Sequence, residues 1–400
     1  MKRLLVPLGL FLVIAAMGIL FLPSSSRMPH SMPAGGQSPI PHVVANEASI
    51  TAKAADEKTI VPEAIATAAG ASVMQDHDLH KTQHECAEVS AAGQPEWVIS
   101  VPVATLWVSP GETRLIDRAS IGASADIMDW IRSMAIADKL WLVGRLETQA
   151  LLGTKVIVLD RRGDWVKVAI PEQATPKDAR GYTGWLPKEQ LTEQRVIYER
   201  CPLVTISAPT TALYDGAYTD MVYKVASFNT TLPLVAREQE RLGVAVPGAE
   251  KLKWLKVQDG RIEPAPAAHK QTAFKGDIPH VSGDQLVQTA KQFLNLPYLW
   301  SGTSGFGFDC SGLMYTIHRY YGIWIPRDAK DQAASGRKVE TADLMPGDLL
   351  FYAYNNGKGK VHHVAMYIGS GQMIHSPKTE RSVEIIAMNT PEYAGARRYY

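Results

Sequence analysis

Cysteine is scarce in this 400-residue chain, which contains only Cys86, Cys201 and Cys310. An exported protein usually pairs its cysteines or omits them, and an odd number leaves at least one thiol unpaired. Cys86 and Cys201 could form a disulfide, although the sequence alone does not show that they do. The remaining thiol needs another explanation, and catalysis is one.

An excess of charge of either sign is also missing. The chain has 41 basic and 40 acidic residues, which leaves a formal net charge of +1. No overall field therefore favours nucleic acid or an acidic surface as a partner. Because 46% of the residues are hydrophobic and the chain is long, we expect several globular domains and no nucleic-acid partner.

The N-terminal region has targeting character. Lys2 and Arg3 precede an uncharged apolar run over residues 4–23, and this pattern is typical of a secretory signal peptide or a membrane anchor. Since residues 24–26 form only a weak cleavage site, we favour an uncleaved anchor over a cleaved signal, with a buried helix as the remaining alternative. The first two predict an extracytoplasmic protein, in the periplasm or cell envelope, that contacts the membrane only through this segment. The sequence does not indicate an oligomeric state.

The middle of the chain predicts two small β-domains. Residues 24–94 are rich in Ser, Pro and Ala and are expected to form a mostly flexible linker, with a short helix within 63–88. In residues 95–195, two strand patterns flank a turn at 160–164, while residues 126–152 have helical spacing. We interpret this region as a small barrel with a helical insertion.

A weak internal repeat suggests a second barrel at residues 203–265. The strand that begins with Trp165 is echoed by the strand around Trp254. Together with the Gly-Tyr-Thr-Gly-Trp-Leu-Pro segment at 181–187, these strands resemble tandem bacterial SH3-like barrels. Chance similarity between amphipathic strands is the alternative. A Pro/Ala-rich linker then leads to a segment at 282–400.

The C-terminal segment places Cys310 at the start of a helix. A helix is predicted over 284–294, and the Gly-rich residues 302–307 predict a flexible loop before Cys310. Beyond Cys310, apolar residues recur at helical spacing. A helix N-terminus favours a thiolate, and its backbone N–H groups can stabilise an oxyanion. A buried structural cysteine is the alternative.

Two histidines favour catalysis. Residues 363–368 and 372–376 read as strands joined by a turn at 369–371. With a three-residue turn, Ile368 would face Gln372, and His363 and His375 would share one face of the sheet; a four-residue turn would separate them. We expect Cys310 to attack a carbonyl, His363 to carry its proton and His375 to orient His363.

The two other histidines of this segment are given no catalytic role. His362 points to the opposite face of its strand and is interpreted as structural. His318 is placed on the polar side of the predicted helix and is expected to be solvated.

Several motifs in one order resemble the NlpC-type cell-wall cysteine peptidases, a papain-like family. They are Pro-Tyr-Leu-Trp at 297–300, Phe-Asp-Cys-Ser-Gly at 308–312, Ile-Pro-Arg-Asp at 325–328, Met-Pro-Gly-Asp-Leu at 345–349 and His-Val-Ala-Met-Tyr-Ile-Gly at 363–369. The resemblance covers nearly all of 282–400. It implies an α+β papain-like domain, with helices on an antiparallel sheet, in which Cys310, His363 and His375 form the catalytic triad without metal or cofactor. One departure is Ser301, where a glycine is common.

With two SH3-like domains before the segment at 282–400, the whole chain resembles the γ-D-glutamyl dipeptidyl peptidases of murein recycling. This resemblance implies that the first barrel roofs the active-site cleft and restricts the substrate to peptidoglycan stem peptides with a free N-terminal L-Ala. It also implies cleavage between D-Glu and the following diaminopimelate or Lys.

The amine of such a substrate requires anions or hydrogen-bond acceptors near the nucleophile. The candidate substrate-binding residues are Tyr182, Tyr298, Trp300, Asp309, Ser311, Arg327 and Asp328. Asp309, Ser311 and Tyr182 are candidates for the amine, and the Tyr298 hydroxyl for the oxyanion. The alternatives are a helix cap for Asp309, core packing for both tyrosines and a structural pairing of Arg327 with Asp328.

Other function classes remain open at this stage. The same scaffold could carry another acyl transfer, such as an amidase or transpeptidase reaction. The chain could also be a non-catalytic peptidoglycan-binding protein, although the presence of both Cys310 and His363 argues against this. A metal hydrolase is disfavoured because no carboxylate lies at a recognised zinc-binding spacing from the histidines.

Overall fold

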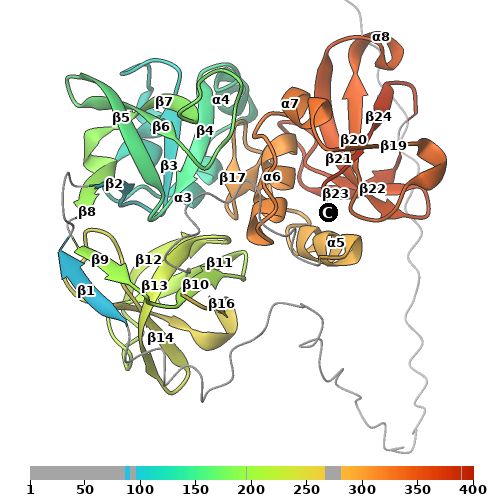
Figure 1. The fold of residues 1–400 in the computed structure, drawn as a ribbon. Coiled ribbons are helices and arrows are strands. Elements are labelled where there is room, and N and C mark those ends of the chain that lie inside the picture. Colours follow the sequence, from blue (N-terminus) through green and yellow to red (C-terminus); the bar gives the residue numbers. More distant parts are fainter. Residues whose placement is uncertain (1–85, 91–95, 195, 266–280, 389) are drawn as a thin grey trace, which may run out of the picture. The chain divides into compact units, whose positions relative to one another are not determined.

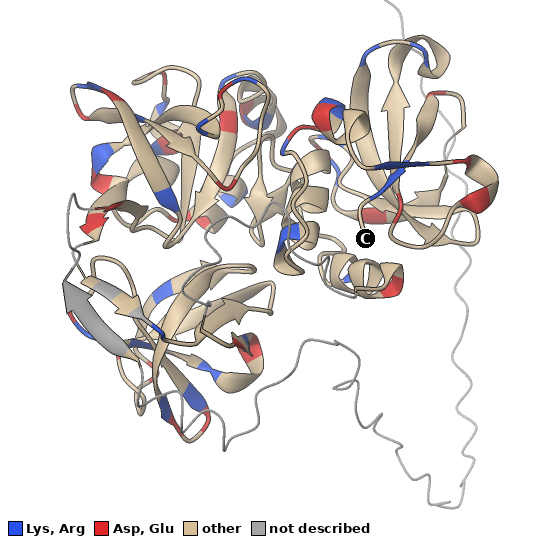
Figure 2. Ribbon diagram, viewed as in Figure 1, with Lys and Arg blue, Asp and Glu red and all other residues tan. Residues whose placement is uncertain are grey.

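The computed structural model describes residues 86–90, 96–194, 196–265, 281–388 and 390–400, all within one unit from Ala64 to Tyr400. The predicted signal or anchor at 1–23 and most of the predicted linker at 24–94 lie outside the described residues. Within the described part of the chain, none of the helices has the length and apolar character needed to span a bilayer. Basic and acidic residues are interspersed along the ribbon (Figure 2), in keeping with the balanced charge.

The first β-domain is built on a seven-stranded sheet with helices between its second and third strands (Figure 1). Its strands are β2 (Glu96–Ile99), β3 (Val103–Trp107), β4 (Leu146–Leu151), β5 (Lys155–Arg162), β6 (Trp165–Ile170), β7 (Tyr182–Pro187) and β8 (Leu191–Gln194). Its helices are η1 (Leu115–Asp117), α2 (Arg118–Ile121), α3 (Ile127–Ser133), α4 (Ile136–Trp141) and η2 (Lys188–Gln190).

The helical insertion is shorter than its hydrophobic spacing predicts. Asp126 caps α3 by accepting a hydrogen bond from the Asp129 backbone N–H at 2.9 Å, and the buried Trp130 indole donates to Asp117 at 3.0 Å. The predicted helix over 126–152 is wrong beyond α4, because Gly144 adopts a φ of +77° that favours glycine and ends the helix. The following segment pairs with β3 instead, so tertiary strand pairing overrides local spacing.

The second β-domain has a seven-stranded sheet and a small two-stranded addition. Its strands are β10 (Leu203–Ile206), β11 (Thr210–Tyr214), β12 (Val222–Ser227), β13 (Thr231–Glu238), β14 (Arg241–Val244), β15 (Lys253–Lys256) and β16 (Gly260–Glu263), with η3 (Val257–Asp259) before the last. The addition pairs β1 (Ala87–Ser90) with β9 (Val196–Glu199). Cys86 and Cys201 form a disulfide beside this pair, so the described end of the predicted linker and helix region is a strand.

Closed barrels were expected, and in this respect the prediction is wrong, because both sheets are open. The strand order is β4-β3-β7-β6-β5-β2-β8 in the first and β12-β11-β15-β14-β13-β10-β16 in the second. Register shifts interrupt β3–β4 and β5–β6 in the first sheet and β11–β12 and β13–β14 in the second. Such bulges bend and twist the strands. Each sheet therefore wraps around its own apolar core, although its two end strands share no ladder among the described residues.

The C-terminal domain packs helices on a six-stranded sheet of order β19-β24-β20-β21-β22-β23. Its strands are β17 (Thr303–Ser304), β18 (Gly307–Phe308), β19 (Arg337–Val339), β20 (Leu349–Ala353), β21 (Val361–Gly369), β22 (Gln372–His375), β23 (Glu384–Ala387) and β24 (Tyr393–Arg398). Its helices are α5 (Gly283–Lys291), α6 (Cys310–Tyr320), α7 (Ala329–Ala334), η4 (Thr341–Asp343) and α8 (Tyr354–Gly357). The predicted α+β class is confirmed.

Two local features of this domain fix the position of α6. The apolar residues Leu313, Met314 and Ile317 are fully buried against the sheet, in the core that also contains Val364 of β21. The predicted flexible loop before Cys310 is instead a buried hairpin of β17 and β18. The Thr303 backbone N–H and the Ser304 hydroxyl both donate hydrogen bonds to the side-chain oxygen of Gln149 on β4. These polar groups are buried and need protein partners because water does not reach them. The first β-domain therefore supports the segment that leads into α6.

Candidate active site

Cys310 is the first residue of α6 and the unpaired cysteine of the described chain. Asp309 caps the helix, since its carboxylate accepts a hydrogen bond from the Gly312 backbone N–H at 2.6 Å. The Cys310 sulfur lies within hydrogen-bonding reach of the backbone N–H groups of Ser311 and of Val364 on β21. The thiol therefore lies between a helix N-terminus and the strand that carries His363.

The surroundings of Cys310 favour the protonated form of its thiol. Burial, aided by the Asp309 carboxylate, raises the pKa of Cys310 to about 12, whereas the two backbone N–H groups and the Arg327 guanidinium oppose this shift. Because a buried charge is costly, the thiolate has to form as a base removes the proton.

The hairpin of β21 and β22 brings two imidazoles together. Gly369 pairs with Gln372 and Tyr367 with Met373, with a register shift between them. The predicted pairing of Ile368 with Gln372 is therefore wrong, because Ile368 is bulged out of the ladder. The bulge restores the register further along, and His363 Nε2 lies 2.8 Å from His375 Nδ1.

Glu384 of β23 extends this pair and was not anticipated from the sequence. It lies directly opposite His375 in the β22–β23 ladder, and its Oε1 is 3.2 Å from His375 Nε2. Its other oxygen pairs with Arg381 at 2.5 Å. The signal in the sequence is weak, because β23 follows a loop whose length does not reveal the register of the ladder.

The order of these groups assigns the imidazole protons. A carboxylate only accepts hydrogen bonds, so His375 Nε2 carries a proton and donates a hydrogen bond to Glu384. In a neutral ring the Nδ1 atom of His375 then accepts, which requires His363 Nε2 to be the donor. His363 Nδ1 is left with a free lone pair. Burial, aided by His375, lowers the pKa of His363 to about 3, so this imidazole is neutral near pH 7 and its Nδ1 can accept a proton.

The remaining histidines of this domain lie outside the pair. The His362 ring stacks on Tyr354 with ring centroids 4.3 Å apart, and its Nε2 lies 3.2 Å from Glu392. The prediction of a solvated His318 is wrong: its side chain is fully buried, and its Nδ1 lies 2.8 Å from the Met314 carbonyl oxygen one turn earlier. The helix is covered by the C-terminal strand region on that side, where Tyr399 packs against the ring.

Arg327 forms a buried network under the nucleophile. Its guanidinium donates to both Asp309 oxygens at 2.7 and 3.1 Å, to the Ser311 hydroxyl at 3.0 Å and to Thr148 of β4 at 3.1 Å. Only 1% of the Arg327 side chain is exposed. Through its bonds to Asp309 and Ser311 it stabilises the start of α6 from within the protein. The pairing of Arg327 is with Asp309 and not with Asp328, and substrate contacts of Asp309, Ser311 and Arg327 stay predictions.

Tyr182 and Asp328 meet at the boundary between β7 and the segment before α7. The Tyr182 hydroxyl donates to the Asp328 carboxylate at 3.1 Å. Lys177 Nζ lies 3.2 Å from the same hydroxyl and 3.4 Å from Glu147 of β4. Burial, with the neighbouring Asp328 charge, raises the pKa of Tyr182 far above its usual range, so this phenol remains a donor. Glu147 is a further acidic group that was missed from the sequence, since β4 was read as a helix.

Tyr298 and Trp300 flank the site in different ways. Tyr298 is buried near Cys310, and burial keeps its pKa well above the usual value. Its hydroxyl therefore retains a proton that it can donate. The Trp300 indole donates to the Leu146 carbonyl of β4 at 3.3 Å and packs in the core of the first β-domain. The structure thus uses Trp300 at a domain contact, and its role in binding substrate stays a prediction.

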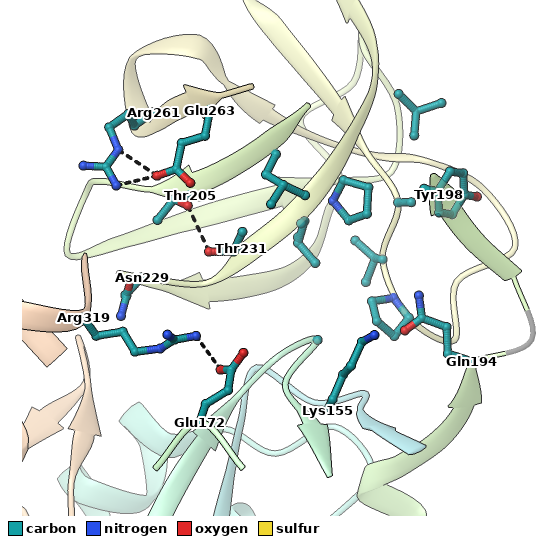
Figure 3. Close-up of a pocket in the computed structure, with 18 of the residues that line it drawn as sticks. Lys155, Glu172, Gln194, Tyr198, Thr205, Asn229, Thr231, Arg261, Glu263 and Arg319 are labelled. Carbon is teal, nitrogen blue, oxygen red and sulfur yellow. Dashed lines mark hydrogen bonds and ion pairs between the residues drawn. The ribbon is translucent and has the colours of Figure 1, made fainter. Parts of the chain in front are cut away.

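A cavity of about 1630 Å³ lies apart from these residues (Figure 3). Its walls include Glu172, which pairs with Arg319 at 2.6 Å, and Arg261, which pairs with Glu263 at 2.5 Å. None of Cys310, His363 and His375 contributes to its lining. The cavity therefore takes no part in the chemistry of the thiol.

Comparison with known protein families matches a segment in each of the three domains. Residues 295–397 match the NlpC/P60 family, residues 206–262 match the YKFC SH3b2 domain, and residues 143–191 match the bacterial dipeptidyl-peptidase Sh3 domain. The predicted resemblance to cell-wall cysteine peptidases with tandem SH3-like domains is confirmed.

Two similar proteins are covered over nearly their full length by this chain. The γ-D-glutamyl-L-lysine dipeptidyl-peptidase of Bacillus cereus is 46% identical over 309 residues, which are 75% of this chain and 90% of that protein. The protein of the same name from Bacillus subtilis is 40% identical over 293 residues, 73% of this chain and 93% of that protein. A crystal structure of a NlpC/P60 family protein from Bacillus cereus matches with a TM-score of 0.69 at 45% identity, over 76% of this chain and 99% of that one. The chain therefore belongs to the NlpC/P60 family of cysteine peptidases and carries two SH3b-type domains ahead of its peptidase domain.

Proposed function

We propose that the protein is a dipeptidyl-peptidase that hydrolyses the bond between γ-D-glutamate and the following diamino acid, Lys or diaminopimelate, in peptidoglycan stem peptides. The observation that carries this proposal is the partly buried thiol of Cys310 at the start of α6, beside the strand whose His363 is hydrogen-bonded to His375 at 2.8 Å. The bond that is cleaved is inferred from the names of the two Bacillus relatives, of which this chain covers 90% and 93%.

The chemistry follows from the protonation of the resting site. As the Cys310 sulfur attacks the γ-carbonyl carbon, its proton passes to Nδ1 of His363, so that neither of these partly buried groups carries a lone charge before substrate binds. The carbonyl oxygen becomes an oxyanion, and the Tyr298 hydroxyl is our candidate donor to it. His363 then gives the proton to the leaving α-amine of the diamino acid.

The acyl-enzyme is resolved by the same groups. A water molecule loses a proton to His363 as its oxygen attacks the thioester carbon, and the proton returns to the Cys310 sulfur as the carbon–sulfur bond breaks. Throughout, His375 holds the His363 ring by its far nitrogen, and Glu384 holds His375 in the tautomer that accepts. His375 and Glu384 are positioning residues in this scheme.

We further propose that the substrate requires a free N-terminal amine. Tyr182, Asp328 and Glu147 offer a hydroxyl and two carboxylates to a cation. Asp328 directly follows Arg327, whose guanidinium bonds to the residues on either side of Cys310. An ammonium bound by this group would keep a short peptide in register with the nucleophile, which explains the release of an N-terminal dipeptide.

The apolar run at residues 4–23 supports export of the protein and anchoring at the membrane. We propose an extracytoplasmic location on this basis, and the pairing of Cys86 with Cys201 fits an oxidising compartment. Cell fractionation, with protease treatment of intact cells, tests this location. If the protein were degraded only after the cytoplasm is opened by lysis, the proposed location would be contradicted.

A product assay tests the reaction. The purified protein is incubated with L-Ala-γ-D-Glu-L-Lys or its diaminopimelate counterpart, and the products are followed by mass. Release of L-Ala-D-Glu, lost in Cys310→Ala, is the expected result. Equal cleavage of the N-acetylated substrate would contradict the free-amine requirement alone. If the wild type cuts nothing while Cys310→Ala binds intact cell wall, the protein is a wall-binding protein and the proposal is wrong.

A further inference from the structure

The proposed amine site already holds a cation of the chain itself. Lys177 Nζ donates to the Tyr182 hydroxyl at 3.2 Å and lies 3.4 Å from Glu147 and 3.9 Å from Asp328. Lys177 comes from the segment between β6 and β7, which covers residues 171–181. An ammonium group of the chain itself therefore contacts all three candidate acceptors.

We propose that Lys177 is an internal competitor for the N-terminal ammonium of the substrate, and so determines how strongly the enzyme depends on that amine. This inference rests on the proposed function. The substrate ammonium needs the same acceptors that Lys177 uses, and two ammonium groups within about 4 Å of each other repel. Binding of the peptide therefore requires Lys177 to leave.

The segment that carries Lys177 is fixed at its base. Gln173 is buried and bonds to Thr148 and to the Gln149 carbonyl at 2.7 and 2.6 Å, and the Ala174 carbonyl accepts from the Arg327 backbone N–H at 3.4 Å. These contacts tie the segment both to β4 and to the residue before Asp328. The backbone thus holds Lys177 beside the acceptors without closing the site.

The side chain of Lys177 is free to move within this frame. About half of it is exposed, at 49%, whereas the side chains of Glu147 and Asp328 are 26% and 25% exposed. A long, half-exposed side chain changes rotamer without any movement of the backbone, and its head group is easily solvated. Lys177 can therefore withdraw into water when a better-placed ammonium arrives, at the modest cost of exposed ion pairs.

The test is a binding cycle between Lys177 and the substrate amine. Affinities are measured by calorimetry in the Cys310→Ala background, with Lys177 or Lys177→Met. The ligands are L-Ala-γ-D-Glu-L-Lys and its desamino analogue, in which a propionyl group replaces L-Ala. We expect Lys177→Met to tighten binding of the amine-bearing peptide about fivefold, because exposed ion pairs of this kind are modest, and to leave the desamino analogue unchanged or weaker.

Lys188→Met is the matched control, because Lys188 lies in the same domain, loses the same charge and pairs only with the exposed Asp164 among the interactions described. It should change neither affinity. Unchanged or weaker binding of the amine-bearing peptide to Lys177→Met would overturn the inference, and so would equal tightening of both ligands.

The failure of the proposed free-amine requirement has a different signature. In that case the wild-type protein would cleave the desamino analogue as well as the amine-bearing peptide, whatever residue stands at position 177.

Discussion

His375 Nε2 lies 3.2 Å from Glu384 Oε1, and the two residues face each other across β22 and β23. This contact fixes which nitrogen of His375 carries its proton, and therefore which nitrogen of His363 is free to act as a base.

Replacing Glu384 should impair turnover through His375. We expect Glu384→Ala to lower kcat/KM about tenfold, as is common when a partner of a functional imidazole is removed. Glu384→Gln keeps a carbonyl acceptor and should lose less. The pH–rate profile of Glu384→Ala should also shift, which a loss of packing alone would not cause. Glu392→Ala is the control, since Glu392 contacts His362 outside the pair. Identical profiles for both variants would exclude the tautomer role.

The two paired histidines should differ in importance. His363→Ala removes the base and should lower kcat by about 10²–10⁴-fold, whereas His375→Ala only loosens the orientation of His363 and should cost less. The comparison is made by steady-state kinetics with the tripeptide, and His362→Ala should leave the rate close to that of the wild type. An unchanged rate in His375→Ala would remove His375 from the mechanism.

Arg327 should be essential for stability. Arg327→Met leaves the Asp309 carboxylate mostly buried without its partner, so we expect the free energy of unfolding to fall by about 3–5 kcal/mol. Urea denaturation measures the change. Arg180→Met, which removes an arginine from an exposed pair with Asp178, should leave the free energy of unfolding nearly unchanged. Similar losses in both variants would show that the network around Arg327 contributes nothing specific.

Buried neutral histidines should make the fold sensitive to acid. Burial lowers the pKa of His318 to about 4, whereas an unfolded chain protonates histidine near 6.5. Between these values the unfolded state binds more protons, so stability is lost as pH falls from about 6.5 to about 4.

His318→Phe tests this dependence, because phenylalanine keeps a ring against Tyr399 and cannot titrate. It gives up the contact with Met314 and should be somewhat less stable at pH 7. Its free energy of unfolding, measured in urea at pH 7, 5.5 and 4, should nevertheless fall less steeply than that of the wild type. Since the pKa of the partly buried His363 is also lowered, the slope should be reduced and not abolished. Parallel slopes would contradict the assignment.

The sequence predicts those parts of the site that depend on local pattern. The helix beginning at Cys310 follows from apolar spacing after a capping Asp309, and the helix starts there in the structure. The shared face of His363 and His375 follows from the period of a strand. The turn itself was predicted wrongly, since Ile368 is bulged, yet the two rings still meet because the bulge shifts the register by one residue.

The parts that were missed depend on tertiary pairing. Glu147 lies on a strand whose apolar spacing also fits a helix, and only its ladder with β3 decides between the two. Glu384 meets His375 through a register that the intervening loop conceals. His318 is buried by Tyr399, which lies 81 residues further along the chain. Local periodicity contains no information on any of these partners.

Gln149 of β4 also has a practical consequence for protein engineering. Its side-chain oxygen accepts from the Thr303 backbone and the Ser304 hydroxyl, while Leu299 and Phe306 pack into the apolar core of the first β-domain. A fragment that contained only residues 282–400 would turn these polar groups and apolar side chains toward water. The C-terminal domain is therefore poorly suited to use as an isolated peptidase. Transferring it to another protein would require a redesigned surface around residues 299–306.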